Sequence, residues 1–159
     1  MLARFGGDID AAISLLDRSL TLNPSFALGW FWSGTLRLYA GEPDLAIEHF
    51  DKSLRLSPHD LMAARTLTMI AYAHFFAHRF DRALPMLLVS LEESPTWAGP
   101  YRFLAVCHAH LGHLAEAQEM VRRLRTITTA VMESATHWRN PEQRELYLSG
   151  LRLAAGEAT

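Results

Sequence analysis

The stretch Gly41-Glu42-Pro43-Asp44-Leu45-Ala46-Ile47 decides the fold of this chain, because close variants of it recur three more times. The variants are Gly7-Asp8-Ile9-Asp10-Ala11-Ala12-Ile13, His78-Arg79-Phe80-Asp81-Arg82-Ala83-Leu84 and Gly112-His113-Leu114-Ala115-Glu116-Ala117-Gln118. Their alanines, at positions 12, 46, 83 and 117, are spaced by 34, 37 and 34 residues. A period near 34 residues, with a small residue at a fixed place, is typical of an array of helix-turn-helix repeats.

Further landmarks follow each recurrence. A large apolar residue stands four positions after each alanine, and a proline closes three of the units: Leu16, Phe50, Leu87 and Val121, then Pro24, Pro58 and Pro95. Asp10, Asp44 and Asp81 suit the first turn of a helix, where a negative charge complements the helix dipole. The landmarks predict an all-α fold with helices over 8–22, 25–40, 43–56, 60–77, 80–93, 97–111, 114–128 and 141–154.

Residues 27–60 form the cleanest unit. The tetratricopeptide repeat (TPR) pattern has Trp, Gly, Gly, Ala, Phe and Pro where this unit has Trp30, Gly34, Gly41, Ala46, Phe50 and Pro58. The chain therefore resembles the TPR family over about residues 7–128, and the resemblance implies a solenoid that winds as a right-handed superhelix. We expect one domain over 1–159, with a partial repeat at about 7–24, repeats at 27–60, 61–97 and 98–129, and a linker with a capping helix at 130–159.

The later units depart from this pattern. Thr68 and Ala105 replace the first glycine in the third and fourth units. The third unit is three residues longer than its neighbours, which predicts that its first helix is extended by roughly 4.5 Å. Asn140 and Pro141 are typical of a helix start and begin the capping helix, whose apolar face is predicted to comprise Leu146, Leu148, Leu151 and Leu153. Trp138 is expected to plug the end of the core.

The run from Arg139 to Arg152 carries a second, narrower resemblance. It is similar to the tail of TPR regions that follow class III adenylate or guanylate cyclase domains, or winged-helix activators, in bacterial proteins. The resemblance implies that the chain is the C-terminal part of a larger signalling protein. The start of the chain in the middle of a repeat agrees with that expectation.

Composition restricts the classes of partner and compartment. The net charge is −2, which argues against nucleic acid as a partner, because phosphate binding needs a basic surface. A single cysteine, Cys107, can form no internal disulfide, and a reducing cytoplasm is the expected location. We find no pattern of a signal peptide and no apolar run long enough to span a membrane.

The first helix of each unit in a TPR array lines a concave groove, so groove residues follow from the register. They are predicted to be Phe31, Thr35, Leu38, Tyr39, Arg65, Met69, Tyr72, Arg102, Val106 and His110. Arg65 and Arg102 are assigned to equivalent places in successive units, where two guanidinium groups would hold the carboxylate of an acidic peptide. The mixture of aromatic, Met and Arg residues suits an extended peptide or an amphipathic helix. The alternative is that the apolar residues are core and the arginines are merely solvated.

Two other functions remain open beside peptide binding. Ile9, Ile13, Leu16 and Leu20 would lack a full partner in the first, incomplete unit, and Phe75, Phe76 and Phe80 are expected near a protruding turn. Both features predict a homodimer, in which the chain would be a dimerisation arm with an empty groove. A third possibility is a small-ligand or metal sensor that uses His74, His78 or His110.

Catalysis and cofactors are not expected. His74 and His78 lie four residues apart, a spacing that can ligate zinc on a helix, but no third ligand is near in sequence. No nucleophile-base-acid set and no Gly-rich phosphate loop is recognisable, and Ser33 belongs to a packed helical stretch. The sequence therefore predicts a binding module that is not an enzyme, with no metal and no cofactor.

Overall fold

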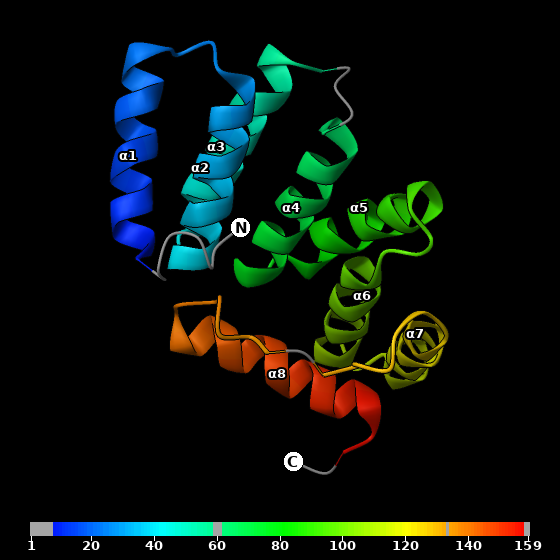
Figure 1. The fold of residues 1–159 in the computed structure, drawn as a ribbon. Coiled ribbons are helices and arrows are strands. Elements are labelled where there is room, and N and C mark those ends of the chain that lie inside the picture. Colours follow the sequence, from blue (N-terminus) through cyan, green and yellow to red (C-terminus); the bar gives the residue numbers. More distant parts are fainter. Residues whose placement is uncertain (1–7, 59–61, 133, 158–159) are drawn as a thin grey trace.

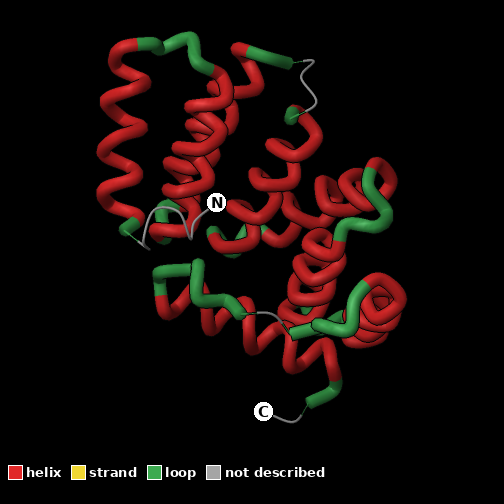
Figure 2. The backbone as a smooth tube through the Cα atoms, viewed as in Figure 1, coloured by secondary structure: helices red, strands yellow, loops and turns green. Residues whose placement is uncertain are grey.

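A computed structural model describes residues 8–58, 62–132 and 134–157, which form an all-α fold (Figure 1). The helices are α1 (Ile9–Leu22), α2 (Ala27–Ala40), α3 (Pro43–Leu56), α4 (Ala63–Phe76), α5 (Phe80–Glu93), α6 (Ala98–His110), α7 (Leu114–Ile127) and α8 (Pro141–Ala155). Figure 2 shows only helices and loops in these described residues. The all-α class and the paired TPR-like arrangement predicted from the sequence are confirmed, and every predicted helix lies within a few residues of an observed one.

The extra length of the third unit lies in its connections and not in its first helix. Helix α4 has 14 residues, as α2 has, so the predicted extension is wrong. The connection over 57–62 is longer than that over 23–26, and the connection over 77–79 is longer than that over 41–42. Loops accept insertions at small entropic cost, whereas a longer helix would shift every packed side chain beyond the insertion.

The register of the three complete units is fixed by the residue that ends each first helix in a left-handed conformation. These residues are Gly41, His78 and Gly112, with φ of 95°, 57° and 79°. In this register the equivalent of Gly34 in the third unit is Ala71, so the assignment of Thr68 to that place is wrong. A small residue is required there because a Cβ on Gly34 would lie 2.8 Å from the ring of Phe50.

The second helix of each unit faces the core with its repeated alanine. Ala46, Ala83 and Ala117 are completely buried, and Ala12 is nearly so. The large residue four positions later is buried in the three complete units, as Phe50, Leu87 and Val121. Leu16, at the same place in α1, is only half-buried. The difference arises because no described helix pairs with α1 as α2 pairs with α3 (Figure 1).

The array ends at α7 for a chemical reason. Ile47 and Leu54 of α3, and Leu84 and Leu91 of α5, are half-buried apolar residues that pack against the core. Leu54 shares a small cavity with Met62 and Thr66 of the following unit. The equivalents in α7 are Gln118 and Arg125, which are exposed. A polar outer face of this kind is what a terminal repeat needs, because nothing stacks on it.

Helix α8 is not an end cap that continues the stack. It packs mainly against α6 and less against α7. The chain after α7 runs back past α6 towards α2, and α8 then returns beneath α4 and α6 in the view of Figure 1. The buried face of α8 consists of Gln143, Tyr147, Gly150, Leu151 and Ala154, while Leu146, Leu148 and Leu153 are half-buried. The four predicted leucines thus all contact the core, with Leu151 completely buried and the other three at its edge, and the prediction missed Gln143, Tyr147, Gly150 and Ala154.

The start of α8 was predicted correctly. The side-chain oxygen of Asn140 accepts hydrogen bonds from the backbone N–H groups of Glu142 and Gln143, at 2.9 and 3.2 Å. Pro141 occupies the first helical position, where its missing N–H costs nothing. A left-handed Gly156 ends the helix with φ of 77°.

Candidate functional site

One equivalent position in each complete unit contacts the C-terminal segment, which we define as residues 128–155. The position lies two residues before the left-handed residue and is occupied by Tyr39, Phe76 and His110. The rings of Tyr39 and Phe76 contact Trp138, with centroid distances of 5.0 and 4.5 Å. The Nε2 atom of His110 is 2.7 Å from the carbonyl oxygen of Leu146. The concave side at these helix ends is thus filled by the chain itself.

Trp138 is the centre of this contact. It is only 3% exposed, and Phe103 and Tyr147 complete its aromatic surroundings. Its carbonyl oxygen accepts hydrogen bonds from Nε and Nη2 of Arg144, at 3.0 and 2.8 Å. Trp138 was predicted to plug the end of the array; it lies instead among the first helices of all three complete units.

The guanidinium group of Arg102 binds backbone carbonyl groups of the connection after α7. Arg102 is 7% exposed, and its Nε and Nη2 donate to the carbonyl oxygens of Val131 and Ala130, at 3.0 and 2.6 Å. By the register of the units its equivalent is Thr68, while Arg65 is equivalent to Leu28 and Gly99. The predicted equivalence of Arg65 and Arg102 is therefore wrong.

The other predicted groove residues are mostly packed. Phe31, Leu38 and Val106 are buried in the core, and Thr35, Met69 and Tyr72 are nearly so. Tyr72 stacks on Phe103 at a centroid distance of 3.7 Å, which joins neighbouring first helices directly. Among the ten predicted residues Arg65 alone is exposed, with Tyr39 and His110 half-buried. Their binding of a partner stays a prediction.

Arg65 lines an open cleft of about 350 Å³. The lining residues come from α4, the end of α5 and the connection before α6: Ala64, Arg65, Thr68, Ser90, Glu93, Ser94, Thr96 and Trp97. The Cζ atom of Arg65 lies 5.5 Å from the centroid of the Trp97 ring, within cation–π range. At one wall the buried hydroxyl groups of Thr68 and Ser90 are 2.8 Å apart and bind each other. We refer to this surface as the Arg65 cleft.

The Arg65 cleft offers a planar cation, an indole and several hydroxyl groups. A guanidinium group presents paired N–H donors that match a carboxylate, and an indole offers a flat apolar surface. Glu93 at the rim would repel a second negative charge. Trp97 was not among the predicted groove residues; the sequence placed it at the first position of the predicted helix 97–111, after a Ser-Pro-Thr run.

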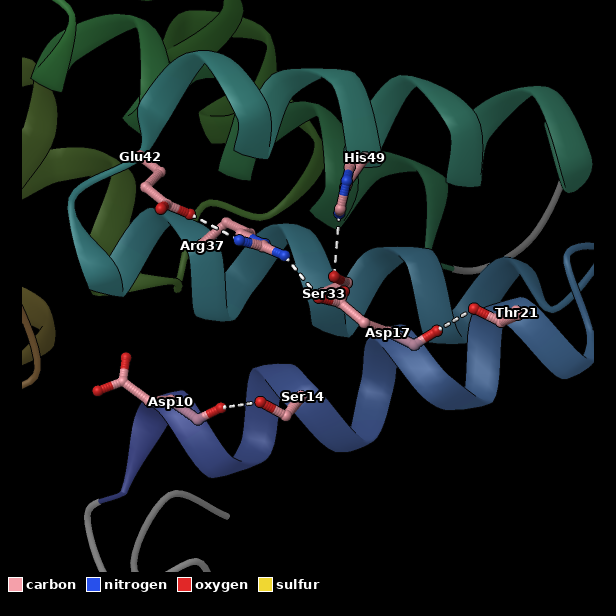
Figure 3. Close-up of polar contacts among 8 residues, drawn as sticks. All are labelled: Asp10, Ser14, Asp17, Thr21, Ser33, Arg37, Glu42 and His49. Carbon is pink, nitrogen blue, oxygen red and sulfur yellow. Dashed lines mark hydrogen bonds and ion pairs between the residues drawn. The ribbon is translucent and has the colours of Figure 1, made fainter.

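A polar network between α1, α2 and α3 is structural (Figure 3). Arg37 lies between Asp17 and Glu42, with N–O distances of 2.8 and 3.1 Å, and so ties the first two helices to the turn before α3. Ser33 is completely buried, and its hydroxyl group lies 2.9 Å from Nδ1 of His49. Burial lowers the pKa of His49, and the positive charge of Arg37 lowers it further. The buried Ser33 has no open surface at which a substrate could meet it.

The two histidines predicted to share a helical face do not do so. Helix α4 ends at Phe76, and His78 follows it with a left-handed φ of 57°. The Nδ1 atom of His74 accepts a hydrogen bond from Nε of Arg79 at 3.0 Å. Burial lowers the pKa of His74, and the positive charge of Arg79 lowers it further. Within the described ranges, no group of three or more His, Cys, Asp or Glu residues is placed to hold a metal ion.

The residues predicted to form a dimer contact are placed differently. Leu20 is buried, Ile9, Ile13 and Leu16 are half-buried, and Phe75 and Phe76 are core residues. The exposed apolar residues of α1 are Leu15 and Leu22, which are 63% and 81% exposed. Leu20 packs beside Gly29 of α2, Phe80 is half-buried, and dimerisation of the chain stays a prediction.

The paired helices, the small residue where they cross and the left-handed residue after each first helix define the tetratricopeptide-repeat fold. A family model described as "Tetratricopeptide repeat" matches residues 1–60. The fold is similar to that of MamA, with a TM-score of 0.67 and 20% identity over 96% of this chain and 90% of that one. For a MamA structure from Desulfovibrio magneticus RS-1 the TM-score is 0.67 and the identity 17%, over 98% of this chain and 84% of that one.

The fold also resembles YrrB, described as "a TPR protein with an unusual peptide-binding site". The TM-score is 0.62 and the identity 20%, over 98% of this chain and 80% of that one. No curated protein sequence matches the chain significantly. No helix of the described residues is both long enough and apolar enough to cross a lipid bilayer.

Proposed function

We propose that this protein is a protein–protein interaction module that binds a peptide segment of a partner at the Arg65 cleft. The observation that carries the proposal is the exposed guanidinium group of Arg65 beside Trp97, in a cleft of about 350 Å³. The other predicted groove residues are buried or half-buried, several of them against the C-terminal segment, whereas Arg65 is exposed in the cleft.

The chemistry of the cleft selects an extended peptide with one negative charge next to an apolar residue. Its carboxylate pairs with Arg65, and the apolar side chain packs against the indole of Trp97. Ser94 and Thr96 lie at the rim and supply hydroxyl groups for the peptide backbone. The description of YrrB as a peptide-binding TPR protein supports the general mode, and it concerns a protein that shares this fold.

The biological setting stays a proposal as well. The tail resemblance over Arg139 to Arg152 supports a bacterial signalling protein with a cyclase or winged-helix domain elsewhere in the chain, and a cytoplasmic location goes with it. We assign no enzymatic step and no cofactor to the module. Homodimerisation, the alternative predicted from the sequence, is tested by sedimentation of the chain at increasing concentration.

Fluorescence polarisation with short labelled peptides tests the function. The probes carry one Glu, or a free C-terminal carboxylate, beside a Leu or Phe; matched probes carry Gln or a C-terminal amide. Native protein is expected to prefer the charged probes, and Arg65→Glu is expected to bind them at least about tenfold more weakly. The control is Arg55→Glu, a similar exposed change on α3 outside the cleft. Equal binding by Arg65→Glu and native protein, or no preference for charged probes, would falsify the proposal.

A further inference from the structure

The end of α4 and the start of α8 border a second open cleft, with a volume of about 590 Å³. In Figure 1 the orange start of α8 lies below the green end of α4. The lining residues come from these two places: Phe76, His78, Asn140, Glu142, Gln143, Glu145, Leu146 and Ser149. We refer to this surface as the Glu142 cleft. It shares no lining residue with the Arg65 cleft.

Acidic side chains stand at the rim of the Glu142 cleft. Glu142 and Glu145 are exposed, and there is no lysine or arginine among the described residues that line the cleft. Arg152, which lies outside the lining, pairs with Glu145. Glu142 forms no ion pair within the described ranges. The cleft therefore keeps one carboxylate that no cation of the described chain neutralises.

The two helix ends at the cleft favour a cation over an anion. The N–H groups of Glu142 and Gln143, at the positive end of α8, already donate to the side-chain oxygen of Asn140. Helix α4 ends at Phe76, so the negative end of its dipole borders the cleft. An anion would thus find these amides occupied and would meet two carboxylates, whereas a cation would meet favourable charge on both sides.

Gln143 adds a buried acceptor to the wall of the cleft. Its side chain belongs to a residue that is only 9% exposed, and its Nε2 approaches the carbonyl oxygen of Gly41 at 3.4 Å. Its Oε1 accepts no hydrogen bond from the described residues. A buried acceptor without a donor is costly, so a ligand that carries N–H donors into the cleft is favoured over one that carries acceptors.

We propose that the Glu142 cleft binds an arginine side chain of a partner protein. The guanidinium group pairs with Glu142 and donates a further N–H to Oε1 of Gln143, while its methylene chain packs against Leu146. A guanidinium group suits this site better than an ammonium group, because its donors spread over a rigid plane and reach two acceptors at once. The site has the opposite charge preference to the Arg65 cleft and goes beyond the proposed function.

NMR titration with two short peptides tests the inference. Both peptides have acetylated and amidated ends; one carries Arg between two leucines, and the other carries citrulline, the uncharged isostere, at the same place. The Arg peptide is expected to shift the amide signals of residues 76–78 and 142–149 in the native protein. It is also expected to bind at least about tenfold more tightly than the citrulline peptide.

Two variants test the proposed contacts separately. Glu142→Gln is expected to bind the Arg peptide about fivefold more weakly, and Gln143→Leu, which removes the buried oxygen, about threefold more weakly. The matched control is Glu116→Gln, because Glu116 is likewise an exposed acid in the first turn of its helix and lies outside the cleft. Circular dichroism of each variant verifies that the fold is intact.

Three results would overturn the inference: signals that shift only outside the cleft, equal affinity for the Arg and citrulline peptides, or equal affinity of Glu142→Gln and native protein for the Arg peptide. Arg65→Glu is expected to bind the Arg peptide normally. Glu142→Gln is expected to bind the acidic probes of the Arg65 cleft normally. Failure of this inference and failure of the proposed function are therefore distinguishable.

Discussion

The backbone N–H of Arg139 donates to the carbonyl oxygen of Tyr39 at 2.8 Å, although the two residues belong to opposite halves of the sequence. Nearby, Nε2 of Gln143 approaches the carbonyl oxygen of Gly41 at 3.4 Å, and the side chain of Arg139 pairs with Asp10 at 2.7 Å. In a simple solenoid each unit touches only its neighbours. Here the C-terminal segment ties the second unit to the last one, so we expect the described units to unfold together.

Trp138→Ala is expected to destabilise the protein by about 3–5 kcal/mol, because it removes a buried indole from among the three first helices. Trp138→Phe keeps an aromatic ring and removes a buried N–H that has no acceptor among the described residues, so it is expected to cost less than about 1.5 kcal/mol. Urea unfolding measures both. A loss by Trp138→Ala no larger than that of the exposed Arg139→Ala would show that the contact is not structural.

Arg102→Met is expected to free the connection after α7, because it removes the donors to Ala130 and Val131. We expect a loss of about 1.5–3 kcal/mol, the range for hydrogen bonds to a charged group. Hydrogen exchange followed by mass spectrometry should show faster exchange after α7, with α2 and α3 unchanged. Arg123→Met, at an exposed arginine paired with Glu119, is the control. Unchanged exchange in Arg102→Met would contradict the assignment.

Stability is expected to fall as the pH decreases below 6.5. His49 and His74 have pKa values lowered mainly by burial, then by Arg37 and Arg79, so the folded state favours the neutral rings. Below pH 6.5 these two histidines bind protons more readily in the unfolded chain than in the folded protein. The stabilisation that is present above pH 6.5 is therefore lost as the pH falls towards the lowered pKa values of the folded state. Melting temperatures between about pH 8 and about pH 5 measure the effect, in a range where most carboxylates stay ionised.

The double variant His49→Gln, His74→Gln is the control for this pH dependence. It removes both titrating groups and is expected to show a flatter profile. An equally steep profile would assign the effect to other groups, among them His108, whose pKa burial also lowers.

Cys107 is expected to be unreactive in the folded protein. Burial raises the pKa of its thiol to about 12, and the thiolate is the reactive form. Reaction with a disulfide reagent at neutral pH should therefore follow the rate of unfolding and become rapid in denaturant. Above pH 9 the unfolded chain loses this proton while the folded one keeps it, so the group also lowers stability between pH 9 and about pH 12. Fast labelling of the native protein would contradict the burial.

The helices and their pairing could be predicted because local features determine them. The repeated alanine, the apolar residue four positions on and the Asn140-Pro141 start each act within one or two turns of a helix. The path of the C-terminal segment could not be predicted in this way. It depends on Trp138 meeting Tyr39 and Phe76, which come from distant units, and no periodicity links these residues.

The candidate site was predicted less well than the fold, for a reason that lies in the third unit. Its extra residues were assigned to a helix, which aligned Arg65 with Arg102 and Thr68 with Gly34. The recurrence that aligns His78 with Gly41 and Gly112 already contained the true register, which the left-handed φ of all three residues confirms, but the groove residues were not counted back from it. Arg65 was still selected, because it lies on a first helix near the concave side.

The contrast between Ile47 or Leu54 in α3 and Gln118 or Arg125 in α7 restricts how this protein can grow by duplication. A copied unit inserted between existing units would pack on the apolar second-helix residues of the unit before it. Its own second helix would offer the same apolar residues to the unit after it. A unit added after α7 would have to bury Gln118 and Arg125, and it would also displace α8 from α6 and α7. Lengthening of the array, in evolution or in the laboratory, is therefore open only upstream of Leu114.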